Sequence, residues 1–551
     1  MRSLPLLVLL AAWAIVTGLL VSPVLGDAGG DTAQYMALAE ALVRGDGYVD
    51  THLPGSPWHV HYPPGLALLF GAVVLAFGPA AFVPAKIAVL TIGVFGLLCF
   101  GRLFARLASE SRAVVVLGIG AFSVYFVRFG ASLLSEMPAM GMLGGTLYYL
   151  DRACDRDGDG GERRYARAAT LAAVFAALGF TFRVANIVAL PALVWMLLRH
   201  FRWRGAWRVA IAVLPPIAFF AWGYGVSHGM FGTDASNGTW SYGDEIAARI
   251  GGPMDIVLHA VQGIPHFVRG IGQSLLDWSF VARYDGLAYV LAAPVILGIV
   301  HAPFGGSAPT DENTSRWRRA PLAWTTVLGV GVACAAPERT IRYLVPYAPC
   351  FAFFFVEGVV VLFRWSVARS RHDGWQRVVP RLGLVAGALL ATAHAPGLVH
   401  ELRARITYPV VAAPPLLQER VAAVRTGDWS ECRSLPEGGP IAMRFASWFQ
   451  VLELARRTTS EDAVLISRKP RFVSYLTGRR CLRLPAGLPP ADLARRLEAM
   501  TFDVFVDDGL FADTRAACAV VEQGLGYVEA GTVRSARLLK APWSAAVKPG
   551  R

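Results

Sequence analysis

Long apolar runs separated by short polar segments dominate the chain. The first run, from Leu4 to Val21, holds about 18 residues, close to the roughly 20 that a helix needs to cross a hydrocarbon core. Similar runs follow at about 84–101, 113–128, 137–150, 168–182, 184–199, 209–227, 286–303, 320–335, 343–363 and 382–399. This pattern predicts a polytopic α-helical membrane protein with about 11 transmembrane helices.

Two apolar runs have a second interpretation. The run 66–77 has only about 12 residues, which is too short to span a membrane, so we expect an interfacial or re-entrant helix there. The first run is also compatible with a cleavable signal peptide, because Val24 and Gly26 are small residues at a suitable spacing. Either interpretation leaves the following loop outside the membrane.

Charge assigns the loops to two sides of the membrane. With the short 66–77 helix left out of the count, every short arginine-rich loop falls on one side, as the positive-inside rule requires. These arginines are Arg102, Arg106, Arg112, Arg152, Arg156, Arg163, Arg164, Arg167, Arg199, Arg202, Arg204, Arg208, Arg316, Arg318, Arg319, Arg364, Arg369, Arg371 and Arg377. The outer face then holds the loop 23–64, the turn 128–136, the segment 228–285, the turn 337–342 and the tail after about 400.

The pattern changes after residue 400. The pair Pro414-Pro415 is typical of a linker. Short β-like runs at 463–466 and 502–506 then alternate with helical patterns at 448–457 and 490–500. This order predicts a transmembrane domain over 1–400 and a soluble, extracytoplasmic α/β domain over 408–551.

Composition agrees with a membrane protein and excludes some classes of function. Of the 551 residues, 55% are hydrophobic and the mean hydropathy is +0.46, which is more apolar surface than one soluble core would bury. The net charge of +13 falls in short clusters without an aromatic-lined basic groove, so we expect no nucleic-acid partner. The preference for arginine over lysine suggests a GC-rich bacterial genome, and hence a bacterial cytoplasmic (inner) membrane.

The cysteines carry little functional information. All seven lie outside the spacings of zinc sites and redox motifs. Cys432, Cys481 and Cys518 lie in the tail, where one disulfide would leave one thiol over.

Two carboxylates on the predicted outer face are candidates for catalysis. Asp31 stands where a helix begins, with Tyr35 on the same helical face, although an aspartate at such a position is often only a helix cap. Glu136 begins a span in the turn Ser135-Glu136-Met137-Pro138, where the helix dipole by itself also favours a glutamate.

Two further segments complete a recognisable order. Tyr62-Pro63-Pro64-Gly65 follows the acidic loop, and Arg342-Tyr343-Leu344-Val345-Pro346 precedes a late span. In this order, over residues 1–360, the chain resembles the GT-C superfamily of membrane glycosyltransferases, near its protein O-mannosyltransferase and aminoarabinose transferase branch. The tail resembles the soluble domain that many such enzymes carry.

The resemblance implies a reaction and a donor. A sugar joined to a polyprenyl phosphate would be transferred at the outer face, by inverting displacement, to a glycolipid, polysaccharide or protein hydroxyl. Asp31 would be the general base. Glu136 would be the second catalytic carboxylate, which orients hydroxyls or joins Asp31 in holding a divalent metal, if the reaction uses one.

The donor phosphate needs cations around it. Arg342 is the first candidate, followed by Arg339 and Arg183, although an arginine at a membrane boundary is often only an anchor. His61 and Tyr62 would line the donor's side of the pocket.

One departure from the family pattern affects the choice of base. The family often has Asp-Glu or Asp-x-Asp in the first loop, whereas Thr32 and Ala33 follow Asp31 here. Asp27 is therefore the rival base, and Tyr35 is a further candidate site residue.

Two other classes of function compete with a transferase. A transporter or flippase would place ionisable residues inside the spans, often in repeated halves, but these carboxylates cluster at the surface and no repeat is visible. A non-catalytic assembly or receptor protein is the third possibility.

Overall fold

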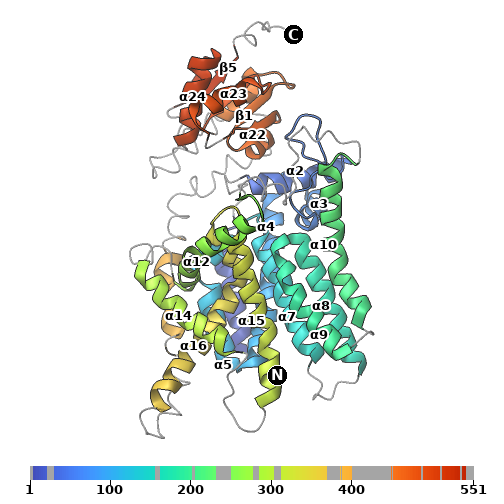
Figure 1. The fold of residues 1–551 in the computed structure, drawn as a ribbon, viewed down its shortest axis with the longest axis vertical. Coiled ribbons are helices and arrows are strands. Elements are labelled where there is room, and N and C mark those ends of the chain that lie inside the picture. The colour runs from blue at the N-terminus through green and yellow to red at the C-terminus, as the bar shows by residue number, and fades with distance from the viewer. Residues whose placement is uncertain are drawn as a thin grey trace.

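The computed structural model places a helical bundle next to a smaller α/β unit. Figure 1 shows the strands as a separate layer beyond the end of the bundle that carries α2 and α3. The structure describes residues 4–21, 30–154, 162–201, 205–230, 250–276, 285–302, 312–368, 385, 387–399, 402, 448, 451–485, 488–508, 512–533 and 536–541.

The bundle consists of helices joined by short connections. They are α1 (Leu4–Leu19), α2 (Asp31–Arg44), α3 (Gly65–Phe77), α4 (Phe82–Leu107), α5 (Glu110–Ala121), α6 (Val124–Gly130), α7 (Glu136–Cys154), α8 (Glu162–Phe182), η1 (Val184–Ala189), α9 (Leu190–Phe201), α10 (Ala206–Ser227), α12 (Pro253–Leu275), α14 (Asp285–His301), α15 (Glu312–Ala335), η4 (Ile341–Tyr347) and α16 (Ala348–Ala368).

Five helices of the described chain are long and apolar enough to cross a membrane, or six if one bent pair counts as a span. They are Phe82–Leu107, Glu162–Phe182, Val184–Phe201, Ala206–Ser227 and Ile341–Ser366. The expected number of about 11 is therefore not confirmed, although the other predicted runs that the structure describes are also helical, including the shorter apolar helix Gly387–Val399. The predicted 66–77 segment is the 13-residue helix α3.

The predicted run 113–128 is not one continuous helix. It is divided into α5 and α6, whose axes differ by 79°. Ser123 causes the division, because its hydroxyl accepts a hydrogen bond from the backbone N–H of Phe126 at 3.2 Å and so caps a new helix.

Helix α7 is the centre of the bundle and carries Glu136 at its start. Nearly all of its side chains are buried. Glycines let α4 approach it closely, since a Cβ on Gly96 would lie 2.5 Å from the Cα of Gly141. Glu136 is therefore held on a rigid, enclosed element.

Two carboxylates, one buried and one partly buried, fasten the end of the bundle opposite to α2. Asp151 on α7 accepts hydrogen bonds from Arg106 and Arg318, and Glu357 on α16 accepts them from Arg112 and Arg319. Each carboxylate thus joins its own helix to two others.

The C-terminal unit contains a five-stranded sheet. Its elements are β1 (Val464–Ser467), α22 (Pro470–Thr477), β2 (Arg480–Arg483), α23 (Pro490–Glu498), β3 (Val504–Asp507), α24 (Ala512–Leu525), β4 (Val528–Val533) and β5 (Ala536–Lys540). The strand order is β2-β1-β3-β5-β4, with β1 parallel to both neighbours and β5 antiparallel to both of its own. Both predicted β-runs are strands, and Cys481 and Cys518 are free and buried, while Cys432 and the linker lie outside the described residues.

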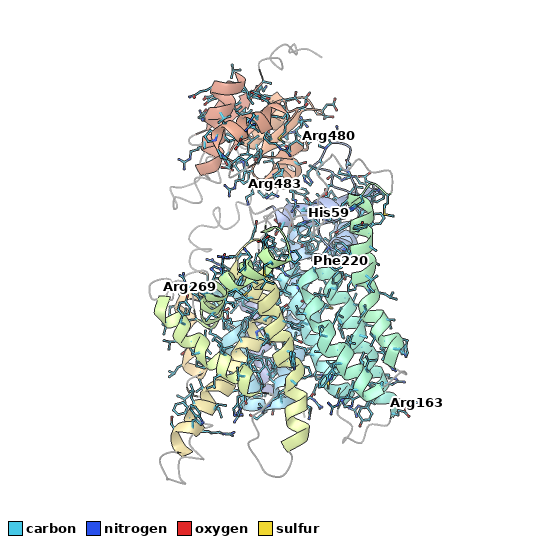
Figure 2. The ribbon with its side chains drawn as sticks, in the orientation of Figure 1. His59, Arg163, Phe220, Arg269, Arg480 and Arg483 are labelled. Carbon is cyan, nitrogen blue, oxygen red and sulfur yellow. The ribbon has the colours of Figure 1, made fainter. Side chains whose placement is uncertain are left out.

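Residues from predicted inner and outer loops lie at different ends of the bundle. Figure 2 places Arg163, from a predicted inner loop, at the end opposite to His59 and the C-terminal unit. The candidate residues for catalysis therefore belong to the end that faces the α/β unit.

Candidate active site

Asp31 is the first residue of α2, and its carboxylate is not used to cap the helix. Gly30 takes the N-cap position with φ 98°, a left-handed conformation that favours glycine. The Asp31 carboxylate instead accepts a hydrogen bond from the Tyr62 hydroxyl at 2.7 Å and another from Nη2 of Arg342 at 2.6 Å. The helix-cap interpretation of Asp31 is therefore wrong.

Glu136 is connected to the same guanidinium. Nε of Arg342 donates to Oε1 of Glu136 at 2.7 Å, and Nη1 of Arg183 donates to that oxygen at 2.9 Å and to the Ser135 hydroxyl at 2.9 Å. Arg342 thus bridges two carboxylates that lie 311 and 206 residues away from it in the sequence. Glu136 is fully buried, and its Oε2 has no hydrogen-bond partner among the described residues.

A third arginine reaches the site from the C-terminal unit. Nη1 of Arg471, on α22, donates to the Tyr62 hydroxyl at 2.6 Å and lies 3.7 Å from Oδ1 of Asp31. The sequence analysis missed Arg471, because no motif surrounds it and it lies 409 residues after Tyr62.

A buried polar group also missed by the sequence analysis holds the loop of Tyr62 in place. The backbone N–H of Tyr62 donates to Nε2 of His59 at 2.8 Å, so the other ring nitrogen of His59 carries the hydrogen that faces Asp50 at 2.7 Å. Gln34 on α2 also donates to Asp50, at 2.7 Å. In the sequence, only the short distance of His59 and Asp50 from the Tyr-Pro-Pro-Gly segment could have indicated this group.

The charges around Asp31 keep it ionised. Burial alone would raise its pKa, but the charges of Arg342 and Arg471, with the hydrogen bonds from Tyr62 and Arg342, hold the pKa well below its usual range. Burial and the nearby Asp31 charge raise the pKa of Tyr62 well above its usual value, despite Arg471. Tyr62 therefore stays protonated and donates a hydrogen bond to Asp31.

Most of the predicted site residues lie together. Asp31, Glu136, Arg342, Arg183 and Tyr62 form one hydrogen-bonded cluster. The centroid of the Tyr35 ring lies 5.0 Å from that of the Tyr62 ring. Asp27 lies outside the described residues.

Two other predicted donor-binding residues, Arg339 and His61, lie outside this hydrogen-bonded cluster. Arg339 precedes η4 and contacts α12, where its Nη2 donates to Oε1 of Gln262 at 3.3 Å. His61 does lie beside Tyr62, with ring centroids 4.6 Å apart. Burial and the charge of Arg471 lower its pKa to about 3, so His61 is neutral near pH 7 and offers no positive charge to a phosphate.

The arrangement suits an anion better than a shared metal ion. Among the described residues, no three histidine, cysteine, aspartate or glutamate side chains gather as metal ligands. Asp31 and Glu136 do not share an open set of oxygens, since the Arg342 guanidinium lies between them.

Comparison with known proteins finds similarity in structure only. No protein-family model and no curated protein sequence matches the chain. The structure of ArnT from Cupriavidus metallidurans bound to undecaprenyl phosphate superposes with a TM-score of 0.55 and 11% identity over 98% of both chains. The apo state of the same protein gives a TM-score of 0.53 and 11% identity over 97% of both chains.

A third solved structure comes from an archaeon. It is the oligosaccharyltransferase AglB of Archaeoglobus fulgidus in complex with an inhibitory peptide and a dolichol-phosphate. Its TM-score is 0.54 at 11% identity, over 98% of this chain and 75% of AglB. Over nearly its whole length, the chain therefore has the GT-C fold of these membrane glycosyltransferases.

Proposed function

We propose that the protein transfers a sugar from a polyprenyl-phosphate donor to an acceptor hydroxyl at the outer face of a bacterial inner membrane, with Asp31 as the general base. The acceptor is a hydroxyl of a glycolipid, a polysaccharide or a protein. The structural neighbours that carry undecaprenyl phosphate and dolichol-phosphate support this class of donor.

The observation that carries the proposal is the convergence of three guanidinium groups on one cluster. Three guanidinium groups, from Arg183, Arg342 and Arg471, face the two carboxylates Asp31 and Glu136 through direct ion pairs. A donor phosphate carries the negative charge that guanidinium groups bind with charge-assisted hydrogen bonds. Guanidinium groups are well suited to hold it as charge develops on the leaving oxygen.

The reaction is a single displacement. The acceptor oxygen bonds to the anomeric carbon of the sugar while the bond from that carbon to the phosphate oxygen breaks. The acceptor's proton passes to Asp31, and the electron pair leaves on the polyprenyl phosphate, whose charge the arginines balance. One displacement inverts the anomeric configuration. Oε2 of Glu136, which is buried without a partner among the described residues, would accept a hydrogen bond from a sugar hydroxyl in the donor complex.

Donor binding would also activate Asp31. While Arg342 lies 2.6 Å from its carboxylate, Asp31 is a weak base because its pKa is held so low. A phosphate that draws Arg342 to itself removes that charge and raises the pKa of Asp31 towards the range in which a general base is effective. The site thus becomes basic when the donor is present.

The test is transfer of labelled sugar in membranes that contain the full-length protein, with a panel of polyprenyl-phosphate sugars and the endogenous acceptors. We expect Asp31→Asn to lower transfer by at least about 100-fold, because general-base catalysis typically contributes that much. Asp46→Asn is the matched control, since Asp46 is an exposed aspartate at the end of α2 that pairs only with its neighbour Arg44 among the described contacts.

Two outcomes would contradict the proposal at different points. Transfer by Asp31→Asn near the wild-type rate would rule out Asp31 as the base. No transfer by the correctly inserted wild type from any donor would rule out the enzyme class and make flux of lipid or solute the next assay.

A further inference from the structure

The C-terminal unit contacts the bundle through α22, next to the site. The Tyr475 hydroxyl on α22 donates to Oε1 of Glu40 on α2 at 2.8 Å, and the Tyr475 ring packs against Phe82. The backbone N–H of Cys481, on β2, donates to the carbonyl oxygen of His52 at 2.8 Å. Side-chain and backbone bonds therefore fasten the α/β unit to α2 and to the 45–64 loop.

Arg471 stands at the point where this contact meets the site. It is the second residue of α22, and its guanidinium is also 5.1 Å from the centroid of the Tyr62 ring. Its side chain is about three-quarters buried, with 26% exposed. The cation is thus placed among groups of the bundle, although the α/β unit supplies it.

We propose that Arg471 is a positioning residue that directs the Tyr62 hydroxyl onto Asp31, so that sugar transfer requires the C-terminal unit to be docked on the bundle. This inference rests on the proposed function, because it assigns Arg471 a part in that reaction. The α/β unit would then contribute a residue to the reaction, at the end of the bundle that carries the site.

The hydrogen-bond geometry explains how Arg471 acts. A tyrosine hydroxyl has one hydrogen to donate and lone pairs to accept with. Because Arg471 donates to the Tyr62 oxygen at 2.6 Å, the single hydrogen of that hydroxyl turns towards Oδ1 of Asp31 at 2.7 Å. Oδ2 of Asp31 is left to Arg342. Without Arg471 the hydroxyl is free to rotate, and Asp31 loses a fixed partner.

Arg471 also contributes charge at Asp31, which makes its effect visible in a pH profile. The charged and titratable groups around Asp31 are Arg342 of η4, Arg471 of α22, Tyr35 of its own helix, Glu136 of α7, and Asp50, His52, His59, His61 and Tyr62 of the 45–64 loop. Loss of the Arg471 charge raises the pKa of Asp31. Since the base must be ionised, the acid limb of kcat/KM then moves to higher pH.

The experiment measures kcat/KM for transfer against pH with the full-length wild type, Arg471→Gln and Arg471→Lys. We expect Arg471→Gln to lower kcat/KM by about 100-fold, as misplacement of a catalytic group does, and to move the acid limb upwards. Arg471→Lys restores the charge and recovers part of the rate. Arg496→Gln, an exposed arginine on α23 of the same unit, is the matched control and should behave as the wild type.

A double-mutant cycle separates positioning from domain stability. In a Tyr62→Phe background the hydroxyl is absent, so Arg471→Lys should change the rate no further. If Arg471 only stabilised the α/β unit, the substitution would cost as much in either background, and the positioning role would be wrong. This cycle also tests the positioning role of Arg471 if the Arg471→Gln variant does not fold.

The rate of the wild type separates failure of the proposed function from failure of the role of Arg471. If the wild type transfers no sugar, the proposed function fails and this inference fails with it. If the wild type transfers sugar while Arg471→Gln keeps its rate and its acid limb, only the role of Arg471 is overturned.

Discussion

At the scale of residues, the main feature of the site is a chain of alternating charges that runs from Arg183 through Glu136 and Arg342 to Asp31. Burial disfavours the charged form of a carboxylate. Guanidinium groups at hydrogen-bond distance from each of the two carboxylates offset this cost. The ion pairs therefore hold both carboxylates in place, and they keep Asp31 ionised at the same time.

The substitution Glu136→Gln tests this series of ion pairs through its effect on the stability of the protein. The substitution leaves Arg183 and Arg342 facing a neutral amide, and breaking a buried ion pair from one side typically costs about 3–5 kcal/mol. We expect a lower Tm for the purified protein, measured by thermal unfolding in detergent. Glu498→Gln, exposed on α23, is the control and should change stability by no more than about 0.5 kcal/mol. An unchanged Tm in Glu136→Gln would contradict a stabilising ion pair at Glu136.

The candidate residues were only partly predictable at this scale. Asp31, Glu136, Arg183, Arg342 and Tyr62 could be selected because they border predicted spans on one face. Arg339 was selected by the same reasoning but contacts Gln262 on α12, because sequence position does not reveal which way a side chain leaves a turn. The roles of these residues in the reaction remain predictions.

At the scale of elements, α3 begins where the chain presses against α8. A Cβ on Gly65 would lie 2.6 Å from the carbonyl oxygen of Thr181, at the end of α8. Gly65 closes the Tyr-Pro-Pro-Gly segment, so this close approach fixes the start of α3 only three residues after Tyr62. The glycine of the motif is therefore required by packing between two helices.

Gly65→Ala is expected to destabilise the protein and to displace Tyr62. Overpacking of this kind typically costs about 1–3 kcal/mol, since backbone atoms must move to admit the methyl group. Gly331→Ala on α15 is the matched control, because no atom lies within 4 Å of the added Cβ and alanine favours a helix. Thermal unfolding should give a lower Tm for Gly65→Ala alone. Equal values for the two variants would show that α3 is free to shift.

At the scale of the whole molecule, the bundle has two different ends. One end carries the site and contacts the α/β unit, and the other carries the ion pairs of Asp151 and Glu357. Figure 2 shows Arg163 and Arg480 at opposite extremes of this arrangement. If the bundle spans a membrane, these two residues face opposite compartments.

Cysteine labelling tests this sidedness. We expect a membrane-impermeant maleimide to label Arg480→Cys in intact spheroplasts and Arg163→Cys only after the membrane is broken. Both arginines are exposed, so access to the reagent depends on the compartment, and the wild type gives the background from the native cysteines. Labelling of both variants from the same side would contradict the topology.

The sequence by itself determined the features that depend on neighbouring residues. Apolar runs, arginine-rich loops and strand patterns predicted a helical membrane protein with an α/β unit, since run length and local charge decide which segments a bilayer accepts. Tertiary structure alone decided that Arg342 bridges Asp31 and Glu136 and that Arg471 arrives beside Asp31. Each of these results from packing between segments far apart in the chain, whose approach no local pattern records.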